Sequence, residues 1–499
     1  MRQHLLVHTR LLDSELSKVR LQARRQTWQD PSRKLRTCLA GIFQQGNDWD
    51  LLGVAFDSFT YYLSFSIKMS QASVFTNVAV GKDKKPVAMP THQLVSNAEY
   101  PPRYIYVIRD TSLPSAFGGS ESWCEFSLPR EMGVLDCMRL AVDITTSAPA
   151  VLMPTAYWLS RAEVYWGSDL VETIYADDLF HETAGMVTKQ YFDQVAPELN
   201  VSKDYDLNTT PVPSGQSRYF IPLKSHLDSM RPFVRGVEAV IKVRVYFAAS
   251  ITADPVLTNP NPANVVTLNE AQLFVCEAQM SRAETDKAEK LHRQGIVQYG
   301  GIFRERQSDA LSFNSSGTTP QYLRSFKNDS AGLVVYIQQQ NGSNASDLVL
   351  APVHDITLQD AVGNKLTEQQ RSDWLKTFVF TDQVDSPFTT HASKQQPNGT
   401  NMYLIPFSSS FQDTIRTGNN YGKRALTSQE RLIYTPVNVG TFPVSANGSV
   451  PAVVGGTPAS AIVNVTSYSY GYIVIRGGKH YVQMVSTADG KSCGKNTMW

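Results

Sequence analysis

The stretch CEAQMSRAETDKAEKLHRQGIVQYGG, residues 276–301, differs from the sequence on both sides of it. Its middle is charged and has helical spacing, whereas the neighbouring segments alternate like strands. Ser281 and Glu284 form the S-x-x-E pattern of a capping box, which satisfies amide groups at a helix start, and Gly295 is placed to end the helix. The pattern predicts one short, solvated helix between two β-rich halves.

The composition of this helix predicts a connector. Two acid–base pairs lie at i,i+4, and each is worth only about 0.2–0.5 kcal/mol on an exposed surface. Its apolar contact is narrow, which argues against a core element. The pairs are Asp286/Lys290 and Glu289/Arg293, and the apolar residues are Ala288 and Leu291.

Period-two alternation predicts strands on both sides of the connector. TYYLSFSIKM (60–69) and VEAVIKVRVYF (237–247) place apolar side chains on one face and polar ones on the other. LSRAEVYWGSDLVETIY (159–175) predicts a hairpin with a turn at Gly167–Ser168, and GYIVIRGGKHYVQMVS (471–486) predicts one with a turn at Gly477–Gly478. Long loops rich in Pro, Gly, Asn and Ser favour a sandwich or jelly roll over a βαβ fold.

An internal repeat suggests that the fold is duplicated. YFIPLKSHL at 219–227 is similar to YLIPFSSSF at 403–411, with an offset of 184 residues. This offset is too long for a solenoid and fits a repeated sandwich domain. We therefore expect an all-β chain of two tandem domains.

The overall composition and charge argue against a protein that mainly binds nucleic acid. The chain has 499 residues, 42% of them hydrophobic and 18% charged, and a formal net charge of +1, so it has no overall field for nucleic acid. Residues 1–40 carry nine Lys or Arg and three acids, a local charge of +6. This arm is either a helix packed on the body or a flexible segment that contacts nucleic acid or an acidic surface.

The cysteines favour a reducing compartment, and the N-terminus gives no sign of secretion. Five cysteines are widely spaced without a CxxC pair, which argues against a disulfide framework and against a zinc site. The N-terminal residues lack the apolar segment of a signal peptide, and no apolar run is long enough to span a membrane. We expect neither secretion nor a membrane span, and we expect the nine N-x-S/T sequons to be unused.

Catalytic patterns are weak. No G-x-S-x-G elbow, H-E-x-x-H helix or phosphate loop is present; ADGKSCGK at 488–495 has Val485 where a phosphate loop needs its first glycine. His4 and His8 lack a third metal ligand. Asp177, Asp178 and His181 are interpreted as loop or strand-end polar residues. The prediction is no enzyme, with no catalytic, cofactor-binding or metal residues, no cofactor and no small-molecule substrate.

Seven segments in order resemble the double jelly-roll major capsid proteins of eukaryotic double-stranded DNA viruses, of the nucleocytoplasmic large DNA virus and polinton-like virus type. The similarity runs through most of residues 55–486. The resemblance implies two tandem eight-stranded jelly rolls joined by a short helix, with a basic N-terminal arm. The segments are ESWCEFSLPREMGVLDCMRLAVDIT (121–145), YWLSRAEVYWGSDLVETIYADDLFH (157–181), the strands from FIPLKSHLDSM to VEAVIKVRVYF (220–247), AQLFVCEAQMSRAETDKAEKLHRQGIVQYGG (271–301), and the later strands NDSAGLVVYIQQQ (328–340), NMYLIPFSSSF (401–411) and TSYSYGYIVIRGGKHYVQMVS (466–486).

The resemblance also implies a domain division and a set of partners. The expected function is a major capsid protein whose pseudo-hexagonal homotrimers tile an icosahedral shell. Expected partners are neighbouring capsomers, penton and minor capsid proteins, and an internal membrane or the genome through the arm. The expected location is the virion, after assembly in the cytoplasm or virus factory of the host cell. The expected divisions are the arm at 1–50, jelly rolls at 51–282 and 296–487, the helical linker at 283–295 and a tail at 488–499.

One alternative from another class stays open. A tandem jelly-roll carbohydrate-binding protein or glycosidase would also be all-β, and would use exposed aromatic residues with paired carboxylates. Trp158, Tyr165 and Trp166 lie near a turn, where they could anchor a subunit interface or fill the core.

Overall fold

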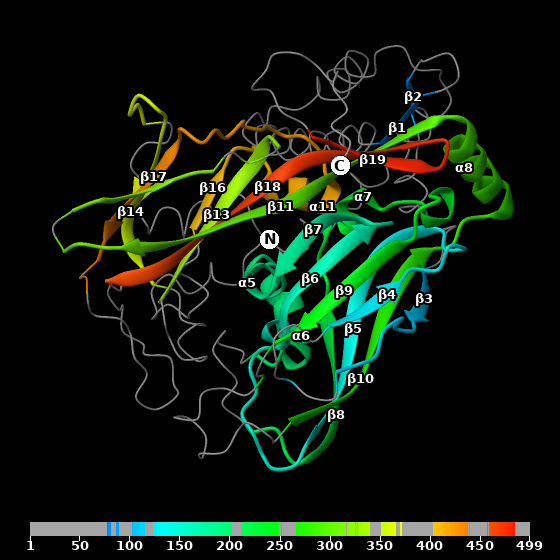
Figure 1. Cartoon of the computed structure of the whole chain (residues 1–499), viewed down its shortest axis with the longest axis horizontal. Coiled ribbons are helices and arrows are strands. Elements are labelled where there is room, and N and C mark those ends of the chain that lie inside the picture. The colour runs from blue at the N-terminus through cyan, green and yellow to red at the C-terminus, as the bar shows by residue number, and fades with distance from the viewer. Residues whose placement is uncertain are drawn as a thin grey trace, which may run out of the picture. The chain divides into compact units, whose positions relative to one another are not determined.

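The structure of the chain is a computed structural model (Figure 1). The predicted strand at 60–69, the basic arm and the C-terminal tail lie outside the described residues. All described strands belong to one compact unit, residues 70–499. The structure describes residues 77–80, 86–88, 102–114, 117, 123–201, 211–248, 251, 266–315, 317–324, 326, 328–339, 351–365, 370–371, 403–437, 439, 457 and 459–484.

Sixteen of the described strands form two sets of eight with the same topology. The first set makes the sheets β3-β10-β5-β8 and β4-β9-β6-β7. The second set makes the path β16-β13-β18-β11 and the sheet β12-β17-β14-β15. Numbered from one to eight within its own set, each half has one sheet ordered 1-8-3-6 and another ordered 2-7-4-5. Two antiparallel sheets with these orders form a sandwich, so the chain contains the same sandwich twice.

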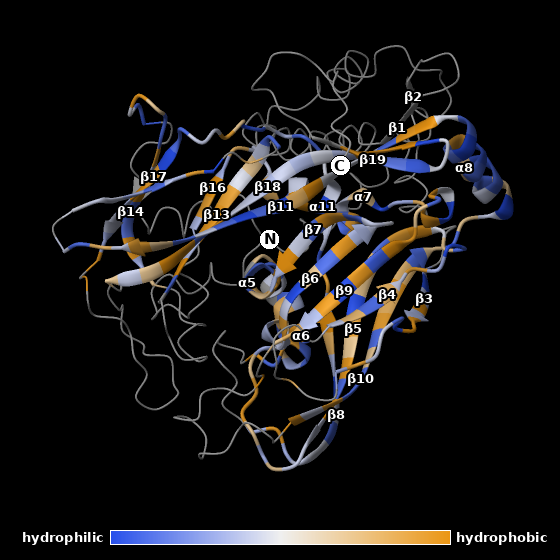
Figure 2. Cartoon of the chain, viewed as in Figure 1, coloured by the Kyte–Doolittle hydropathy of each residue, from blue (hydrophilic) through white to orange (hydrophobic). Residues whose placement is uncertain are grey.

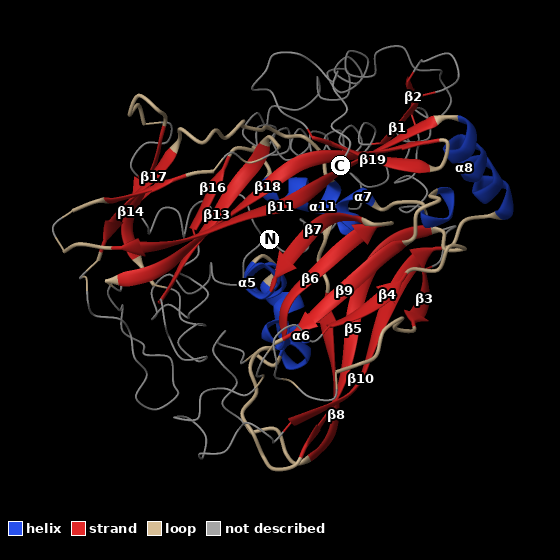
Figure 3. Cartoon of the chain, in the orientation of Figure 1, coloured by secondary structure: helices blue, strands red, loops and turns tan. Residues whose placement is uncertain are grey.

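The sixteen strands follow one another along the chain as two consecutive sets of eight. Figure 3 shows that strands dominate both halves. They are β3 (Pro102–Val107), β4 (Trp123–Ser127), β5 (Val134–Thr146), β6 (Leu159–Trp166), β7 (Asp169–Tyr175), β8 (Gly215–Pro222), β9 (Ile241–Phe247) and β10 (Val266–Ala278) in the first half, then β11 (Ile296–Ser312), β12 (Thr319–Tyr322), β13 (Ser330–Gln339), β14 (Val353–Gln359), β15 (Gln370–Arg371), β16 (Tyr403–Pro406), β17 (Arg431–Pro436) and β18 (Ser460–Arg476) in the second.

Three more strands enlarge one sheet of the second sandwich. β19 (Lys479–Met484) pairs with β18, while β1 (Asn77–Val80) pairs with β11 and β2 (Pro86–Ala88) pairs with β1. β1 and β2 lie within 51–282, the range predicted for the first jelly roll, yet they extend a sheet of the second sandwich. Edge pairing uses backbone groups, so side-chain patterns do not reveal which edge a strand joins.

The two predicted hairpins and their glycine turns are confirmed. β6 and β7 form a hairpin with Gly167 at φ 64°, and β18 and β19 form one with Gly477 and Gly478 at φ 57° and 81°. Positive φ at both central residues is the requirement of a type I′ turn, which glycine meets without steric cost.

The repeated sequences occupy equivalent places in the two sandwiches. YFIP ends β8 and YLIP forms β16, and each of these is the sixth strand of its half. Each is followed by a short helix, α7 (His226–Met230) and α11 (Phe411–Thr417). The duplication inferred from the sequence repeat is therefore also a duplication of topology.

The two longest strands take part in both halves. β11 and β18 have 17 residues each, roughly three times the common strand length of about 5–6 residues. They pair along their full length without a register shift. Val297, Ile473 and Ile475 belong to the first hydrophobic core, whereas Val463 and Val465 belong to the second. The two sandwiches thus share a continuous ribbon.

Figure 2 shows apolar residues along the strands and a mainly hydrophilic connector helix, α8 (Arg282–Gln294). The Ser281–Glu284 capping box is present, and Glu289 pairs with Arg293 at 3.5 Å. Gly295 ends the helix as predicted, but in extended conformation rather than with positive φ. α8 leads from β10 of the first sandwich to β11 of the second, as the prediction of a connector requires.

The buried contact of α8 includes a histidine that the sequence analysis missed. The His292 ring is fully buried, with Nδ1 at 2.7 Å from the Ala288 carbonyl oxygen and Nε2 at 2.6 Å from the Tyr299 hydroxyl. A Cβ on Gly236, in the turn η3 (Val234–Gly236), would come within 2.4 Å of this ring. Among the described residues, no helix is long and apolar enough to cross a bilayer.

Acid should destabilise the fold through this histidine. Burial lowers the pKa of His292 to about 4, below the value of about 6.5 for an unfolded histidine. As pH falls, the unfolded state therefore binds a proton before the folded state does. The contribution of neutral His292 to the unfolding free energy is lost as pH falls from about 6.5 to about 4. In urea unfolding at pH 7 and pH 5, His292→Gln should reduce the drop in unfolding free energy by roughly 1–2 kcal/mol.

The matched control is His354→Gln, because the His354 side chain is 55% exposed. This variant should keep the full drop of the unsubstituted protein. The attribution of this acid sensitivity to His292 would be wrong if His292→Gln lost as much stability between pH 7 and pH 5 as the unsubstituted protein.

Candidate functional site

A buried group of charged side chains joins the two sandwiches. Its carboxylates come from the first half: Glu172 on β7, Asp177 and Asp178 on α5 (Ala176–Phe180), and Glu182 on the π-helical turn η2 (His181–Gly185). Its guanidiniums, Arg304 and Arg306, come from β11 of the second half. We call these six residues the ionic seam.

Arg304 is the centre of the seam. Its side chain is 4% exposed. Nη1 donates to Glu172 Oε1 at 2.7 Å, while Nε and Nη2 donate to the two oxygens of Glu182 in a bidentate pair. The backbone N–H of Arg304 also donates to Glu172, at 3.2 Å. The guanidinium thus binds one carboxylate from β7 and another from η2.

Glu172 continues the network into the first sandwich. Its Oε2 accepts from the backbone N–H of His226 at 2.7 Å and lies 2.8 Å from His226 Nδ1. Trp166 donates its indole N–H to His226 Nε2 at 3.2 Å. Since an indole can only donate, the His226 proton lies on Nδ1 and faces Glu172. Burial alone would raise the pKa of Glu172, but the Arg304 charge and the His226 hydrogen bonds lower it to about 2.

Arg306 forms the second half of the seam. Its Nη2 donates to Asp177 at 3.0 Å and to Asn464 at 2.7 Å, and its guanidinium lies 4.6 Å from the Tyr175 ring centroid. Asp178 accepts from Thr466 at 2.7 Å and lies 4.0 Å from Arg306 Nη1. Burial raises the pKa of Asp178 against the opposing charge of Arg306.

The sequence places two seam residues, Asp177 and Asp178, and the neighbouring His181 in a loop or at a strand end, and this placement is wrong. Asp177, Asp178 and His181 lie on α5 and η2 rather than in a loop or at a strand end. Asp178 and His181 are buried, and burial lowers the pKa of His181 to about 4. Arginines at alternate positions of one strand, Arg304 and Arg306, were the available signal. A buried guanidinium needs buried acidic partners, but nothing in the sequence says where they come from.

The remaining candidates from the sequence are placed as follows. Trp158 and Trp166 are fully buried in the first core, and Tyr165 donates to Glu163 at 2.6 Å, so the two tryptophans fill the core rather than anchor an interface. His4, His8 and residues 488–495 lie outside the described residues.

Three exposed apolar side chains lie on and next to β3. Tyr104, Tyr106 and Ile108 are 71%, 58% and 74% exposed. The two tyrosines belong to β3, an edge strand that pairs only with β10 in its described sheet, and Ile108 follows directly after it. We call these three residues the β3 stripe. Phe274 on β10 lies beside it, with its ring centroid 6.2 Å from that of Tyr106.

The geometry of the seam suits a structural role. Glu172, Asp178 and Glu182 are buried, and the Asp177 side chain is 15% exposed. All four carboxylates are bound to arginine, histidine, threonine or tyrosine, whereas a glycosidase needs its carboxylate pair open to substrate. One further group of possible metal ligands is present among the described residues: Asp136, Cys137 and Cys276.

Comparison with solved structures identifies the fold. PBCV-1 VP54, as fitted into a reconstruction of the virophage Sputnik, aligns with 78% of this chain and 98% of its own, at 11% identity and a TM-score of 0.58. A chain of the PBCV-1 virus capsid model aligns with 78% of this chain and 97% of its own, at 11% identity and a TM-score of 0.60. The chain is a double jelly roll. No family model and no curated protein sequence matches it.

In the double jelly roll, the ionic seam connects the 2-7-4-5 sheet of the first jelly roll, through β7, to the 1-8-3-6 sheet of the second, through β11. Tyr468 on β18 also donates to Glu182, at 2.9 Å. The seam therefore contacts both strands of the long ribbon that the two jelly rolls share.

Removing the central charge should be costly. Arg304→Leu leaves Glu172 and Glu182 buried without their cation, which should lower the unfolding free energy by about 3–5 kcal/mol. The measurement is urea unfolding at pH 7. Arg416→Leu is the control, because the Arg416 side chain is 65% exposed and its pair with Asp413 should be worth no more than about 1 kcal/mol.

A triple variant separates loss of pairing from loss of packing. Combining Arg304→Leu with Glu172→Gln and Glu182→Gln removes the unpaired charges, while the amide oxygens can still accept from His226 and Tyr468, so most of the stability that Arg304→Leu loses should return. An Arg304→Leu protein no less stable than Arg416→Leu would contradict the importance of the seam.

Proposed function

We propose that this protein is the major capsid protein of an icosahedral double-stranded DNA virus and is not an enzyme. The observation that carries the proposal is the double jelly roll itself, which covers nearly the whole of a chain from the PBCV-1 virus capsid. The ionic seam supports the proposal, because its charges pair with one another between the two jelly rolls. The expected location is the virion, and assembly would take place in the cytoplasm or virus factory of the host.

A trimer is the oligomer that this fold suits. Three copies of a chain with two jelly rolls of one topology bring six similar units around a threefold axis, which gives a nearly hexagonal outline. Such a unit can tile a shell only if the angle between its two jelly rolls is fixed. The ionic seam and the shared ribbon supply that rigidity.

The β3 stripe supports self-association. Exposed tyrosines and an isoleucine on an edge strand are the kind of surface that subunit interfaces bury. We propose that a neighbouring copy in the trimer covers this stripe.

Negative-stain electron microscopy of the purified chain tests this proposal. Hexagonal particles with the mass of a trimer are expected. The double variant Tyr106→Ser/Ile108→Ser should shift the population toward monomers by sedimentation. Val362→Ser should not, although Val362 is 86% exposed. Monomers that gain thermal stability with glycans would instead support the carbohydrate-binding alternative.

The basic arm is the proposed contact to the interior of the particle. Its local charge of +6 would attract the genome or an anionic membrane in a salt-dependent way. Penton and minor capsid proteins are further proposed partners. We propose that the units of assembly are the jelly rolls at 51–282 and 296–487, with the linker at 283–295 between them.

Deleting residues 1–40 tests the role of the arm. Trimers should form as before, because the seam, the ribbon and the β3 stripe lie outside the deleted segment. Under expression conditions in which the full-length chain forms particles, electron micrographs of the deletion variant should show few closed shells. Loss of trimers in the deletion variant would contradict this division of roles.

A further inference from the structure

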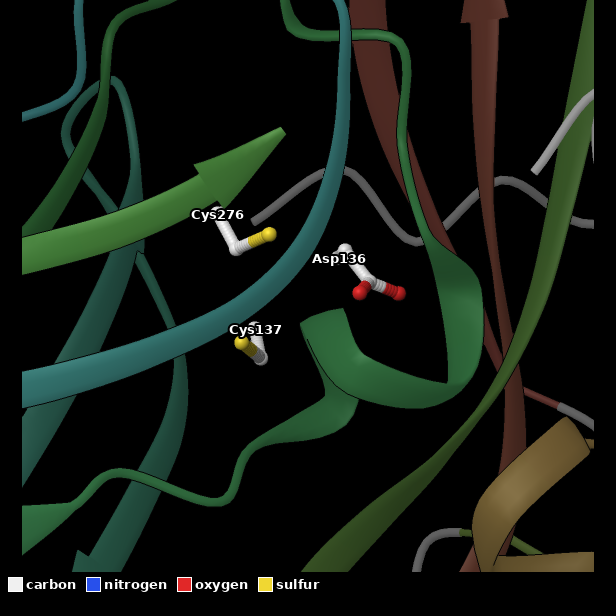
Figure 4. A group of neighbouring side chains, drawn as sticks. All are labelled: Asp136, Cys137 and Cys276. Carbon is white, nitrogen blue, oxygen red and sulfur yellow. The ribbon is translucent and has the colours of Figure 1, made fainter. Parts of the chain in front are cut away.

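Two cysteines that are 139 residues apart in the sequence face each other in the first jelly roll. Cys137 on β5 and Cys276 on β10 are directly paired across the antiparallel ladder. The carboxylate of Asp136 lies with them, and one ligand atom from each of the three residues is within 4.8 Å of the other two. Figure 4 shows the two cysteines on neighbouring strands, with Asp136 next to Cys137.

A β-bulge makes this arrangement possible. Consecutive strand residues normally point to opposite faces, so Asp136 and Cys137 should diverge. The register shifts at this point: Cys276 pairs with Cys137, but Glu277 pairs with Leu135, which leaves Asp136 as the extra residue. Bulges re-aim side chains in this way and are common next to functional sites.

The charged neighbour of Cys276 has partners of its own. Glu277 pairs with Arg103 at 3.4 Å and accepts from the Gly133 backbone N–H at 2.8 Å.

We propose that Asp136, Cys137 and Cys276 form a binding site for a soft divalent metal ion of the Zn²⁺ class. Two thiolates and one carboxylate supply three ligands, and water supplies the fourth. Tetrahedral bonds of about 2.0–2.3 Å place ligand atoms roughly 3.3–3.8 Å apart, so the three side chains need to close only slightly. Binding would replace the two thiol protons, which leave to solvent.

The surroundings of the site determine which Asp136 oxygen can bind the ion and from which side the ion can enter. Arg231 pairs with Asp136 Oδ1 at 3.1 Å, so one oxygen of this carboxylate is engaged and Oδ2 is the proposed ligand. Asp136 and Cys137 are partly exposed, which gives an ion a route from solvent, whereas Cys276 is buried. A bound ion would clamp β5 to β10, the two central strands of the 1-8-3-6 sheet of the first jelly roll.

Titration of the reduced, full-length protein with Co²⁺ tests the site. Co²⁺ bound to thiolates gives a sulfur-to-metal charge-transfer band and tetrahedral d–d bands, and one equivalent should produce both. Zn²⁺ should displace the Co²⁺ and abolish the bands. Cys137→Ser and Cys276→Ser should each weaken Co²⁺ binding by more than about 100-fold, beyond the range typical of changes to outer-shell partners.

The control is Cys124→Ser, because Cys124 is a buried cysteine on β4 in the other sheet of the same jelly roll. It should keep both bands, and circular dichroism checks that each variant is folded. Asp136→Asn should keep the charge-transfer band but bind Co²⁺ at least about tenfold more weakly. The proposal would be overturned by any of three results. The bands could persist in Cys137→Ser, the affinity for Co²⁺ could be unchanged in Asp136→Asn, or protein purified without reductant could contain a Cys137–Cys276 disulfide.

Discussion

The Arg304 guanidinium, buried between Glu172 and Glu182, is the interaction on which the arrangement of this molecule depends. A charge removed from water is tolerated only with partners in good geometry. Here the partners come from β7 and η2 of one jelly roll, and the charge comes from β11 of the other. Neither jelly roll can satisfy these groups alone. The two must therefore meet at one place and in one orientation.

The shared ribbon extends this constraint along the molecule. β11 and β18 contribute to the first core at one end and to the second core at the other. Tyr468 on β18 and Arg304 on β11 bind the same carboxylate, so the ribbon and the seam reinforce each other. The connector helix α8 is a smaller element, anchored by one buried histidine. The helix links the halves covalently, while the ribbon and the seam hold the angle between them.

A fixed angle has a direct consequence for the proposed assembly. A capsomer that tiles a shell presents contacts on several sides at once, and bending between its two lobes would misalign them. Buried polar networks are often associated with a unique geometry rather than with added stability. We expect the seam to serve geometry in this sense, while apolar burial in the two cores supplies most of the free energy.

Local features of the fold followed from the sequence because their causes are local. The capping box at Ser281, the glycine turns at Gly167 and Gly477, and strand alternation each depend on residues a few positions apart. The repeat of YFIP and YLIP also marked the sixth strand of each jelly roll. What only the tertiary structure decided are the meetings of distant residues: Arg304 with Glu172 and Glu182, Cys137 with Cys276, and β1 with the second sandwich. These depend on strand order, on a bulge at Asp136 and on edge pairing, and backbone hydrogen bonds set all three without a side-chain pattern that could be read along the chain.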